Sequence, residues 1–249
     1  MTLVAIPVHQ RGDLVRHCFA TVAELELPGG SEVVVFDDQS PTLDVPGLVR
    51  TTRLVCRLER STTRLGADGM VAHIWRHFLD SSHETLLFLD SDMIANRDAV
   101  TVGLRLAGRF DGLVSLYNST MHPGTPLNRE LLSKATVGNA GTFWSRRHAQ
   151  LALDGVGNEV SAIDFAYCRL FERLGIPIAT PTQSRLQHLG IIGFNNRYYG
   201  NLDHGIGFVP DAPAQWHAIG YVYNELMTRQ SEFLRPPEPN WLSRWWRRG

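Results

Sequence analysis

Lysine and cysteine are scarce in this sequence, and its positive and negative charges nearly cancel. Lys134 is the only lysine among 24 basic residues, and the net charge at pH 7 is −1. The overall charge therefore favours neither nucleic acid nor a strongly acidic substrate as a partner. The cysteines are widely spaced and suggest neither a disulfide framework nor a metal-binding knuckle, which favours a reducing setting; they are Cys18, Cys56 and Cys168.

Long apolar runs are also absent. No stretch approaches the roughly 20 apolar residues of a transmembrane helix, and residues 1–10 lack the basic and apolar regions of a secretory signal. We therefore expect a cytoplasmic protein. The chain has 249 residues, of which 43% are hydrophobic, so it can bury the core of one large domain with a small extension.

Short β-rich runs alternate with helical patterns along the chain. Runs rich in Val, Leu and Ile predict strands at residues 3–8, 32–36, 53–58, 85–90 and 112–117. Apolar residues at helical spacing predict helices at residues 13–25, 66–79, 97–107 and 161–174, with Asp13 as an N-cap and Gly175 as a stop. Apolar strands separated by helices are typical of a parallel sheet covered on both faces. We therefore expect an α/β fold.

The later part of the chain has weaker patterns. Residues 137–151 predict a glycine turn, a short strand and a helix. After residue 181 the sequence is rich in Asn, Gly, His and aromatic residues and predicts no clear element. Residues 234–240 read LRPPEPN, which interrupts regular structure and predicts a linker.

Two pairs of acids stand where predicted strands end. Asp37 and Asp38 follow the second strand, and Asp90 and Asp92 close the fourth. Parallel sheets bind ligands at the carboxyl ends of their strands. Buried carboxylates this close repel each other, and a divalent cation such as Mg²⁺ or Mn²⁺ would relieve both the repulsion and the desolvation. The sequence thus favours a metal that holds a phosphorylated ligand, with Asp92 as the N-cap of a helix near Ile94 as the alternative.

Six segments, in order, resemble the motifs of GT-A glycosyltransferases, above all those of family 2. EVVVFDDQS at residues 32–40 resembles the block that ends their second strand, and LLFLDSDM at residues 86–93 resembles their Asp-x-Asp motif. The other segments are AIPVHQR (5–11), GNAGTFWSRRH (138–148), IDFAYCRLFERLG (163–175) and SRLQHLG (184–190).

The resemblance implies a GT-A, Rossmann-like fold with a mostly parallel central sheet flanked by helices and an irregular C-terminal extension. The catalytic domain would cover residues 1–210. Within it, a nucleotide-binding half would end near residue 118 and an acceptor half would follow. Residues 211–249 would form the extension, with the Pro-rich linker and a tail rich in Trp and Arg.

The resemblance also implies a role for each matching residue. The implied contacts with the nucleotide, its diphosphate, the donor sugar and the acceptor are Pro7, Asp37, Asp38, Arg64, Asp90, Gly141 and Thr142. The implied metal ligands are Asp92, Asp90 and His188. Asp164 would be the general base and Glu159 its backup, while a simple helix cap is the alternative for Asp164. Two positions depart from the family pattern: Gln39 replaces a glycine, and Ile163 replaces an acid.

These roles describe a metal-dependent glycosyltransferase. It would move a sugar from a nucleotide-diphosphate donor to an acceptor hydroxyl, with inversion because a candidate base is present. UDP is the default nucleotide, with GDP and dTDP open, and the acceptor would be a glycan, a lipid-linked sugar or a small molecule. One alternative is a sugar-phosphate nucleotidyltransferase, but its loop rich in Gly, Arg and Lys is absent after the first strand. The other is an inactive carbohydrate-binding module.

Several other features have a functional and an ordinary interpretation. His73 and His77 lie one helical turn apart, but without the glutamate of a zinc-protease motif we interpret them as packing residues. Residues 195–201, NNRYYGN, suit sugar binding or a plain turn. The tail at residues 240–249, NWLSRWWRRG, suits an anionic membrane surface or a segment docked on the domain.

Overall fold

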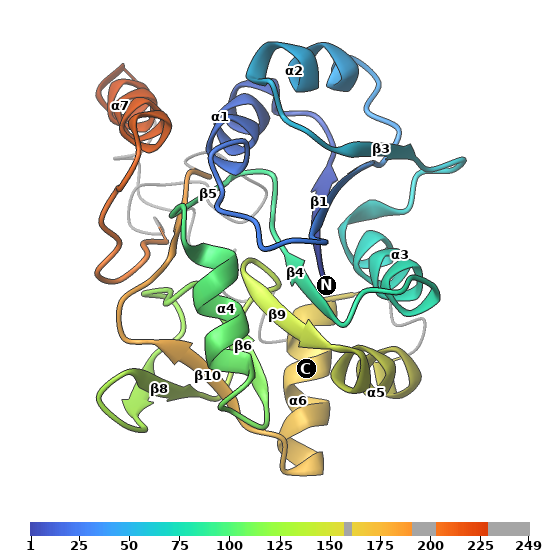
Figure 1. The fold of residues 1–249 in the computed structure, drawn as a ribbon, viewed down its shortest axis with the longest axis vertical. Coiled ribbons are helices and arrows are strands. Elements are labelled where there is room, and N and C mark those ends of the chain that lie inside the picture. The colour runs from blue at the N-terminus through green and yellow to red at the C-terminus, as the bar shows by residue number, and fades with distance from the viewer. Residues whose placement is uncertain (157–160, 191–202, 229–249) are drawn as a thin grey trace, which may run out of the picture.

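The computed structural model describes residues 1–156, 161–190 and 203–228, which form a nine-stranded sheet flanked by helices (Figure 1). The strand order is β3-β2-β1-β4-β9-β6-β10-β8-β7. The strands of this sheet are β1 (Thr2–Val8), β2 (Glu32–Asp37), β3 (Arg57–Arg60), β4 (Thr85–Phe88), β6 (Leu113–Ser115), β7 (Gly124–Pro126), β8 (Leu131–Lys134), β9 (Thr142–Ser145) and β10 (Ile178–Pro181). A second, two-stranded sheet pairs β5 (Met93–Ala95) with β11 (Leu186–His188).

The helices lie between the strands along the chain. They are α1 (Gly12–Val22), α2 (Val45–Thr52), α3 (Gly66–Asp80), α4 (Ala99–Ala107), α5 (Arg146–Val156), α6 (Ile163–Leu174) and α7 (Pro213–Thr228). β1 to β4 pair in parallel, whereas β9 runs antiparallel to both β4 and β6. The expected α/β architecture with a mostly parallel central sheet is therefore confirmed.

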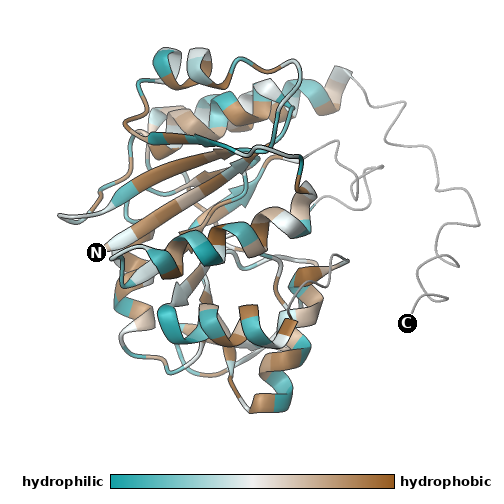
Figure 2. Ribbon diagram, turned by 90° about the vertical axis from the view of Figure 1, so that its right-hand side faces the viewer, coloured by the Kyte–Doolittle hydropathy of each residue, from teal (hydrophilic) through white to brown (hydrophobic). Residues whose placement is uncertain are grey.

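Side chains of the central strands alternate between two apolar layers. On β1, Val4 and Ile6 pack against the layer that includes residues of α1, α2 and α4. Leu3 and Ala5 pack on the other side, with residues of α3, α5 and α6. Figure 2 shows the hydrophobic central strands between helices that alternate hydrophobic and hydrophilic positions. Burial on both faces explains why these strands are almost continuously apolar in sequence.

Three local expectations were wrong. Residues 53–58 are not one strand, because α2 extends to Thr52 and β3 begins only at Arg57. The sequence signal for α2 was Asp44, whose carboxylate accepts a hydrogen bond from the amide of Gly47 at 2.9 Å. Asp13 is not an N-cap either, since it lies inside the first turn of α1. Asp92 caps no helix, because the residues that follow it form β5.

The C-terminal helix α7 packs beside α1 (Figure 1). Its Ala218 shares a small apolar cluster with Leu14 of α1, Ile94 of β5 and Leu189. The side-chain amide of Gln215 donates a hydrogen bond to the carbonyl of Ala95 at 2.9 Å. The predicted extension thus begins with a helix anchored on the sheet domain. Across the described ranges, each helix is too short or too polar to cross a membrane.

Candidate functional site

The carboxyl ends of β1, β2 and β4 meet at one edge of the sheet. The amide of Asp38 donates a hydrogen bond to Val8 at the end of β1, and the amide of Leu89 donates to Ala5; both bonds measure 2.9 Å. The chain leaves β1 towards β2 and β3, then returns to β4 on the other side of β1. Such a reversal opens a crevice at the strand ends, where ligands of open α/β sheets bind.

The first acid pair is held by main-chain amides. Asp37 Oδ1 accepts a hydrogen bond from the amide of Ser40 at 2.8 Å. The two carboxylate oxygens of Asp38 accept from the amides of Leu65 at 2.7 Å and Gly66 at 2.9 Å. Both acids are about 4% exposed. They therefore fix the turn after β2 and the start of α3, at the place where the sequence predicts the nucleoside.

Gln39 occupies the position where the family pattern has glycine. Its φ angle is 51°, in the left-handed region that glycine adopts most readily. Its side-chain amide donates to the carbonyls of Ser61 and Thr62, so these hydrogen bonds help hold the strained turn. A cavity of about 230 Å³ lies next to this loop, lined by residues that include Phe36, Arg60, Ser61, Thr62, Leu65 and His73. Because ligand pockets usually exceed roughly 300 Å³, this cavity could take only part of a nucleotide.

The second acid pair is held differently. Asp92 Oδ2 lies 2.8 Å from the Arg11 guanidinium and 3.2 Å from His188 Nε2. Burial alone would raise the pKa of Asp92, but these two neighbours hold it well below its usual range. Burial would likewise lower the pKa of His188, but the Asp92 carboxylate raises it above its ordinary value. Asp92 is thus an ionised carboxylate that faces the Arg11 guanidinium and the His188 imidazole.

Asp90 is compensated less: the charges of His188 and Arg11 lower its pKa, but neither side chain pairs with it. Within the described ranges, no hydrogen bond or ion pair reaches its carboxylate. Burial, and then the charge of Asp92, raise the pKa of Asp90 to about 7. The acid pair is therefore short of positive charge, and an additional cation would stabilise the ionised form of Asp90.

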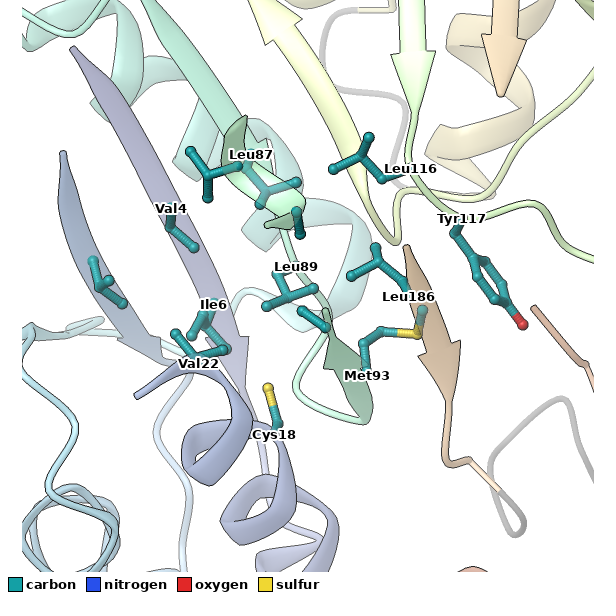
Figure 3. Close-up of a cluster of buried hydrophobic side chains, with 14 of the residues drawn as sticks. Val4, Ile6, Cys18, Val22, Leu87, Leu89, Met93, Leu116, Tyr117 and Leu186 are labelled. Carbon is teal, nitrogen blue, oxygen red and sulfur yellow. The ribbon is translucent and has the colours of Figure 1, made fainter. Parts of the chain in front are cut away.

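Apolar packing holds the strands that carry Asp92 and His188. β5 begins immediately after Asp92 and pairs with β11, so that His188 is opposite Met93. Figure 3 shows Leu89, Met93 and Leu186 together under this pair of strands. A side chain at Gly190 would meet the His188 ring at 2.5 Å and Asp92 at 3.0 Å. Position 190 therefore has room only for glycine while these two groups stay in contact.

Gly141 and Thr142 lie at the start of β9, next to β4. Gly141 has a φ angle of 76°, and a Cβ atom there would lie 2.2 Å from Leu186. The Thr142 hydroxyl is buried; it donates to the carbonyl of Asn139 and accepts from the Trp144 indole, both at 2.7 Å. Thr142 therefore braces the turn that carries Gly141. Its predicted contact with donor sugar or acceptor stays a prediction.

Asp164 lies in the first turn of α6, and the simple cap interpretation of this residue was wrong. The N-cap position belongs to Ala162, at a left-handed φ of 55°. Asp68 of α3 accepts hydrogen bonds from the amides of Ala162 at 3.1 Å and Ile163 at 3.2 Å. Asp164 bonds only the amide of the next residue, Phe165, and burial raises its pKa. A carboxylate with a raised pKa is a better proton acceptor, as a general base requires.

The remaining predicted residues are placed as follows. Pro7 is on β1 in register with Phe36, and Arg64 is exposed in the loop before α3. His73 and His77 pack edge-on against Phe36, as their packing interpretation expected. Glu159, residues 195–201 and the tail at residues 240–249 lie outside the described residues.

Sequence reasoning missed two residues of the site. Arg11 pairs with Asp92 across the crevice, and Asp68 caps the helix that carries Asp164. Arg11 is within the AIPVHQR segment, but no spacing rule connects it to a residue 81 positions later. The bond of Asp68 to α6 likewise depends on tertiary packing.

The donor atoms around Asp92 fit Mn²⁺ or Mg²⁺. Ligands on adjacent corners of an octahedral ion lie about 3 Å apart when each is about 2.1 Å from the metal. The 3.2 Å between Asp92 Oδ2 and His188 Nε2 matches that spacing for the neutral form of His188, which is the form that binds metals. Across residues 1–156, 161–190 and 203–228, no three His, Cys, Asp or Glu side chains form a complete metal cluster. Substrate phosphates and water would have to complete the shell, as they usually do for these ions.

Comparisons with known proteins identify the family and the fold. The family model described as Glycosyl transferase family 2 matches residues 3–175. Three solved structures share the fold. Mannosyltransferase PcManGT from Pyrobaculum calidifontis, with GDP-Man and Mn²⁺, is 23% identical with a TM-score of 0.53, and the match covers 72% of this chain and 54% of that one. S. aureus TarS 1–349 with UDP-GlcNAc is 16% identical with a TM-score of 0.53, over 74% of this chain and 57% of that one. TarS 1–349 alone is 15% identical with a TM-score of 0.54, over 91% of this chain and 65% of that one. The chain thus spans between about half and two thirds of these structures. No curated protein matches it significantly.

Proposed function

The chain belongs to glycosyl transferase family 2, and we propose that it transfers a sugar from a nucleotide-diphosphate donor to an acceptor hydroxyl with Mn²⁺ or Mg²⁺. The observation that carries the proposal is the Asp92 carboxylate in the turn between β4 and β5, held by Arg11 and His188 at the reversal of the sheet. A bound divalent ion would supply Lewis-acid stabilisation of the diphosphate leaving group. Asp92, His188 and Asp90 would hold it.

The other residues have roles that follow from their positions. Asp37, Asp38 and Pro7 shape the edge of the crevice where the base and ribose would lie, and Arg64 extends from the loop before α3. We retain UDP as the default nucleotide. The solved relatives were bound to GDP-Man and to UDP-GlcNAc, so their ligands do not select one base.

The acceptor side supports direct displacement with inversion. Asp164 is free of the capping role that Asp68 performs, and its raised pKa suits proton removal from a hydroxyl. Gly141 and Thr142 lie at the start of β9, which pairs with β4 on one side and with β6 on the other. In this mechanism Asp164 takes the acceptor proton while the nucleotide diphosphate leaves from the opposite face of the sugar.

An apolar surface on α7 supports contact with a membrane. Trp216, Tyr223 and Met227 are 60%, 60% and 56% exposed, and their spacing of seven and four residues puts them on one side of the helix. Gly220, one turn after Trp216, also faces open space. We call these four residues the α7 stripe. The Trp/Arg tail follows in sequence, so we propose that stripe and tail together bind the membrane and that the acceptor is lipid-linked.

Thermal unfolding with added nucleotides tests the proposed function. UDP, GDP and dTDP are each added with and without Mn²⁺ to the wild type, to Asp92→Ala and to the surface control Asp13→Asn. A nucleotide at 100 times its Kd should stabilise the fold by about 2.7 kcal/mol, or roughly 5–10 °C. We expect one nucleotide to do so only with Mn²⁺, and only in the wild type and the control. Failure of every nucleotide would contradict the proposal.

The two alternative functions make different predictions. A nucleotidyltransferase would be stabilised by a nucleoside triphosphate rather than by a diphosphate. Residues 7–17, PVHQRGDLVRH, have one glycine and no lysine to hold a triphosphate. An inactive carbohydrate-binding module would keep its cellular function after Asp92→Ala. Loss of function in that variant would exclude the module.

A further inference from the structure

Arg11 occupies the face of Asp92 that a metal would need. Its guanidinium lies 2.8 Å from Asp92 Oδ2, the same oxygen that His188 faces at 3.2 Å. Both Arg11 and a divalent ion are positively charged, so they cannot approach this oxygen together without strong repulsion. Metal binding at Oδ2, the oxygen that His188 also faces, therefore requires Arg11 to move away.

The backbone around Arg11 is strained in a way that directs its side chain across the crevice. Gln10 and Arg11 are consecutive non-glycine residues with left-handed φ angles of 62° and 53°. Arg11 is also at the N-cap position of α1, where its side chain makes no capping hydrogen bond. Strained backbone of this kind persists where the surrounding structure requires it, and it is frequent at functional sites.

Exposure indicates which partner of the ion pair can leave. The Arg11 side chain is 41% exposed, whereas that of Asp92 is 7% exposed. Arg11 thus covers a buried carboxylate from the open side of the crevice. Within the described ranges, Asp92 is the one carboxylate that Arg11 contacts. A long, half-exposed side chain with one partner can rotate into the crevice without disturbing the core.

We propose that Arg11 is a tethered cation that pairs with Asp92 before the donor arrives and with the donor's diphosphate afterwards. The guanidinium neutralises Asp92 in the free protein, gives way to the metal, and then forms charge-assisted hydrogen bonds to the phosphate oxygens. This inference rests on the proposed function. It predicts that metal alone binds weakly, and that metal and nucleotide diphosphate strengthen each other's binding.

Two titrations of the full-length protein test this role. Free Mn²⁺ is followed by electron paramagnetic resonance without nucleotide, and UDP and GDP are titrated by calorimetry at saturating Mn²⁺. Arg11→Gln removes the charge and keeps the length of the side chain. We expect it to bind Mn²⁺ alone about tenfold more tightly, and its nucleotide diphosphate about tenfold more weakly, than the wild type. Arg11→Lys keeps a positive charge and should restore weak binding of Mn²⁺ alone.

Arg16→Gln is the matched control. Arg16 is also on α1, but it pairs with Asp13 at the surface, so this variant should match the wild type in both titrations. Asp92→Asn separates the inference from the function it rests on. If wild type binds Mn²⁺ and nucleotide, Asp92→Asn does not, and Arg11→Gln matches wild type, only the role of Arg11 is wrong. Weaker binding of both ligands in a folded Arg11→Gln also overturns it, because Arg11 would then only support the site. If no protein binds Mn²⁺ or nucleotide, both proposals fail.

Discussion

Asp37–Asp38 and Asp90–Asp92 are two acid pairs at neighbouring strand ends, and they are held by different kinds of group. The first pair accepts hydrogen bonds from the main-chain amides of Ser40, Leu65 and Gly66, and its side-chain contacts with the Ser61 hydroxyl and the Arg60 guanidinium are longer, at 3.3 and 3.4 Å. The second pair has no main-chain donor to its carboxylates in the described residues, and Asp92 pairs with the side chains of Arg11 and His188.

The main-chain contacts of the first pair are structural, whereas the side-chain contacts of the second pair can be exchanged for others. A main-chain amide cannot leave without unfolding its loop, so the first pair stabilises the edge of the crevice. Side chains can rotate, so the second pair can exchange one cation for another. The two acid pairs therefore have different roles. Three substitutions in the pairs can test that contrast, and a double variant on α7 tests the membrane contact.

The largest effect is expected for Asp92→Asn. The variant loses the charge that would hold a metal on the donor diphosphate, so kcat/KM for sugar transfer should fall by roughly 100-fold or more. Its melting temperature without ligands should fall, because the ion pairs that lower the pKa of Asp92 are lost, although Asn can still accept from Arg11; circular dichroism checks that the variant is folded. Release of nucleotide diphosphate from a sugar donor measures the activity. An active Asp92→Asn would remove the basis for the contrast.

Asp38→Ala should have the opposite profile. It leaves the amides of Leu65 and Gly66 without their acceptor, which should lower the free energy of unfolding by roughly 2–4 kcal/mol. Urea unfolding followed by circular dichroism measures this loss, with the surface variant Asp13→Ala as control. A variant as stable as wild type, but unable to bind nucleotide, would show that Asp38 acts on the ligand rather than on the loop.

The third test uses the pH dependence of stability. Burial and the charge of Asp92 raise the folded-state pKa of Asp90 to about 7, well above its ordinary value of 3.8. The folded protein therefore binds a proton more tightly than the unfolded chain, and its stability should fall as pH rises from about 4 to 7. Asp90→Asn lacks this dependence, so without metal it should gain stability relative to wild type by a few kcal/mol, at most, between pH 4 and pH 8. The comparison is made by chemical unfolding at several pH values.

Parallel pH profiles of the two proteins would mean that Asp90 is already compensated in the folded state. The pair of Asp92 and His188 affects other ranges. The contribution of Asp92 is lost only as pH falls below 3.8, and that of His188 is lost as pH rises above 6.5, through its raised pKa. Asp92 and His188 are present in both the wild type and Asp90→Asn, so to a first approximation their contributions to stability cancel when the two proteins are compared.

The smallest effect on catalysis is expected for substitutions on α7, because its exposed side chains take no part in the proposed chemistry of the acid pairs. Trp216→Ser with Tyr223→Ser should leave transfer to a soluble acceptor unchanged and reduce sedimentation with anionic phosphatidylglycerol vesicles by severalfold. Val55→Ser, at a position 88% exposed, is the control. Equal sedimentation of the double variant and wild type would contradict membrane contact through the α7 stripe. A changed oligomeric state would instead indicate contact between copies of the chain.

The sequence predicted the strand ends well, and their side-chain partners poorly. Apolar runs located β1, β2 and β4, and the ordered motifs predicted that Asp92 and His188 would meet. The position of Arg11 depends on two left-handed residues that are not glycine, which no composition rule indicates. The missed helix α2 depends on Asp44, a cap whose effect we overlooked beside the apolar run at 53–58. Local patterns therefore identified elements, whereas the ion pairs arose from tertiary structure.

The most direct test of the account is a calorimetric titration of UDP and GDP, with and without Mn²⁺, into wild type, Asp92→Asn and Asp38→Asn. We predict that Mn²⁺ strengthens binding of one nucleotide to wild type and to Asp38→Asn, and has no effect on Asp92→Asn. Mn²⁺-dependent binding that survives in Asp92→Asn and disappears in Asp38→Asn would contradict the assignment of the metal to the second acid pair.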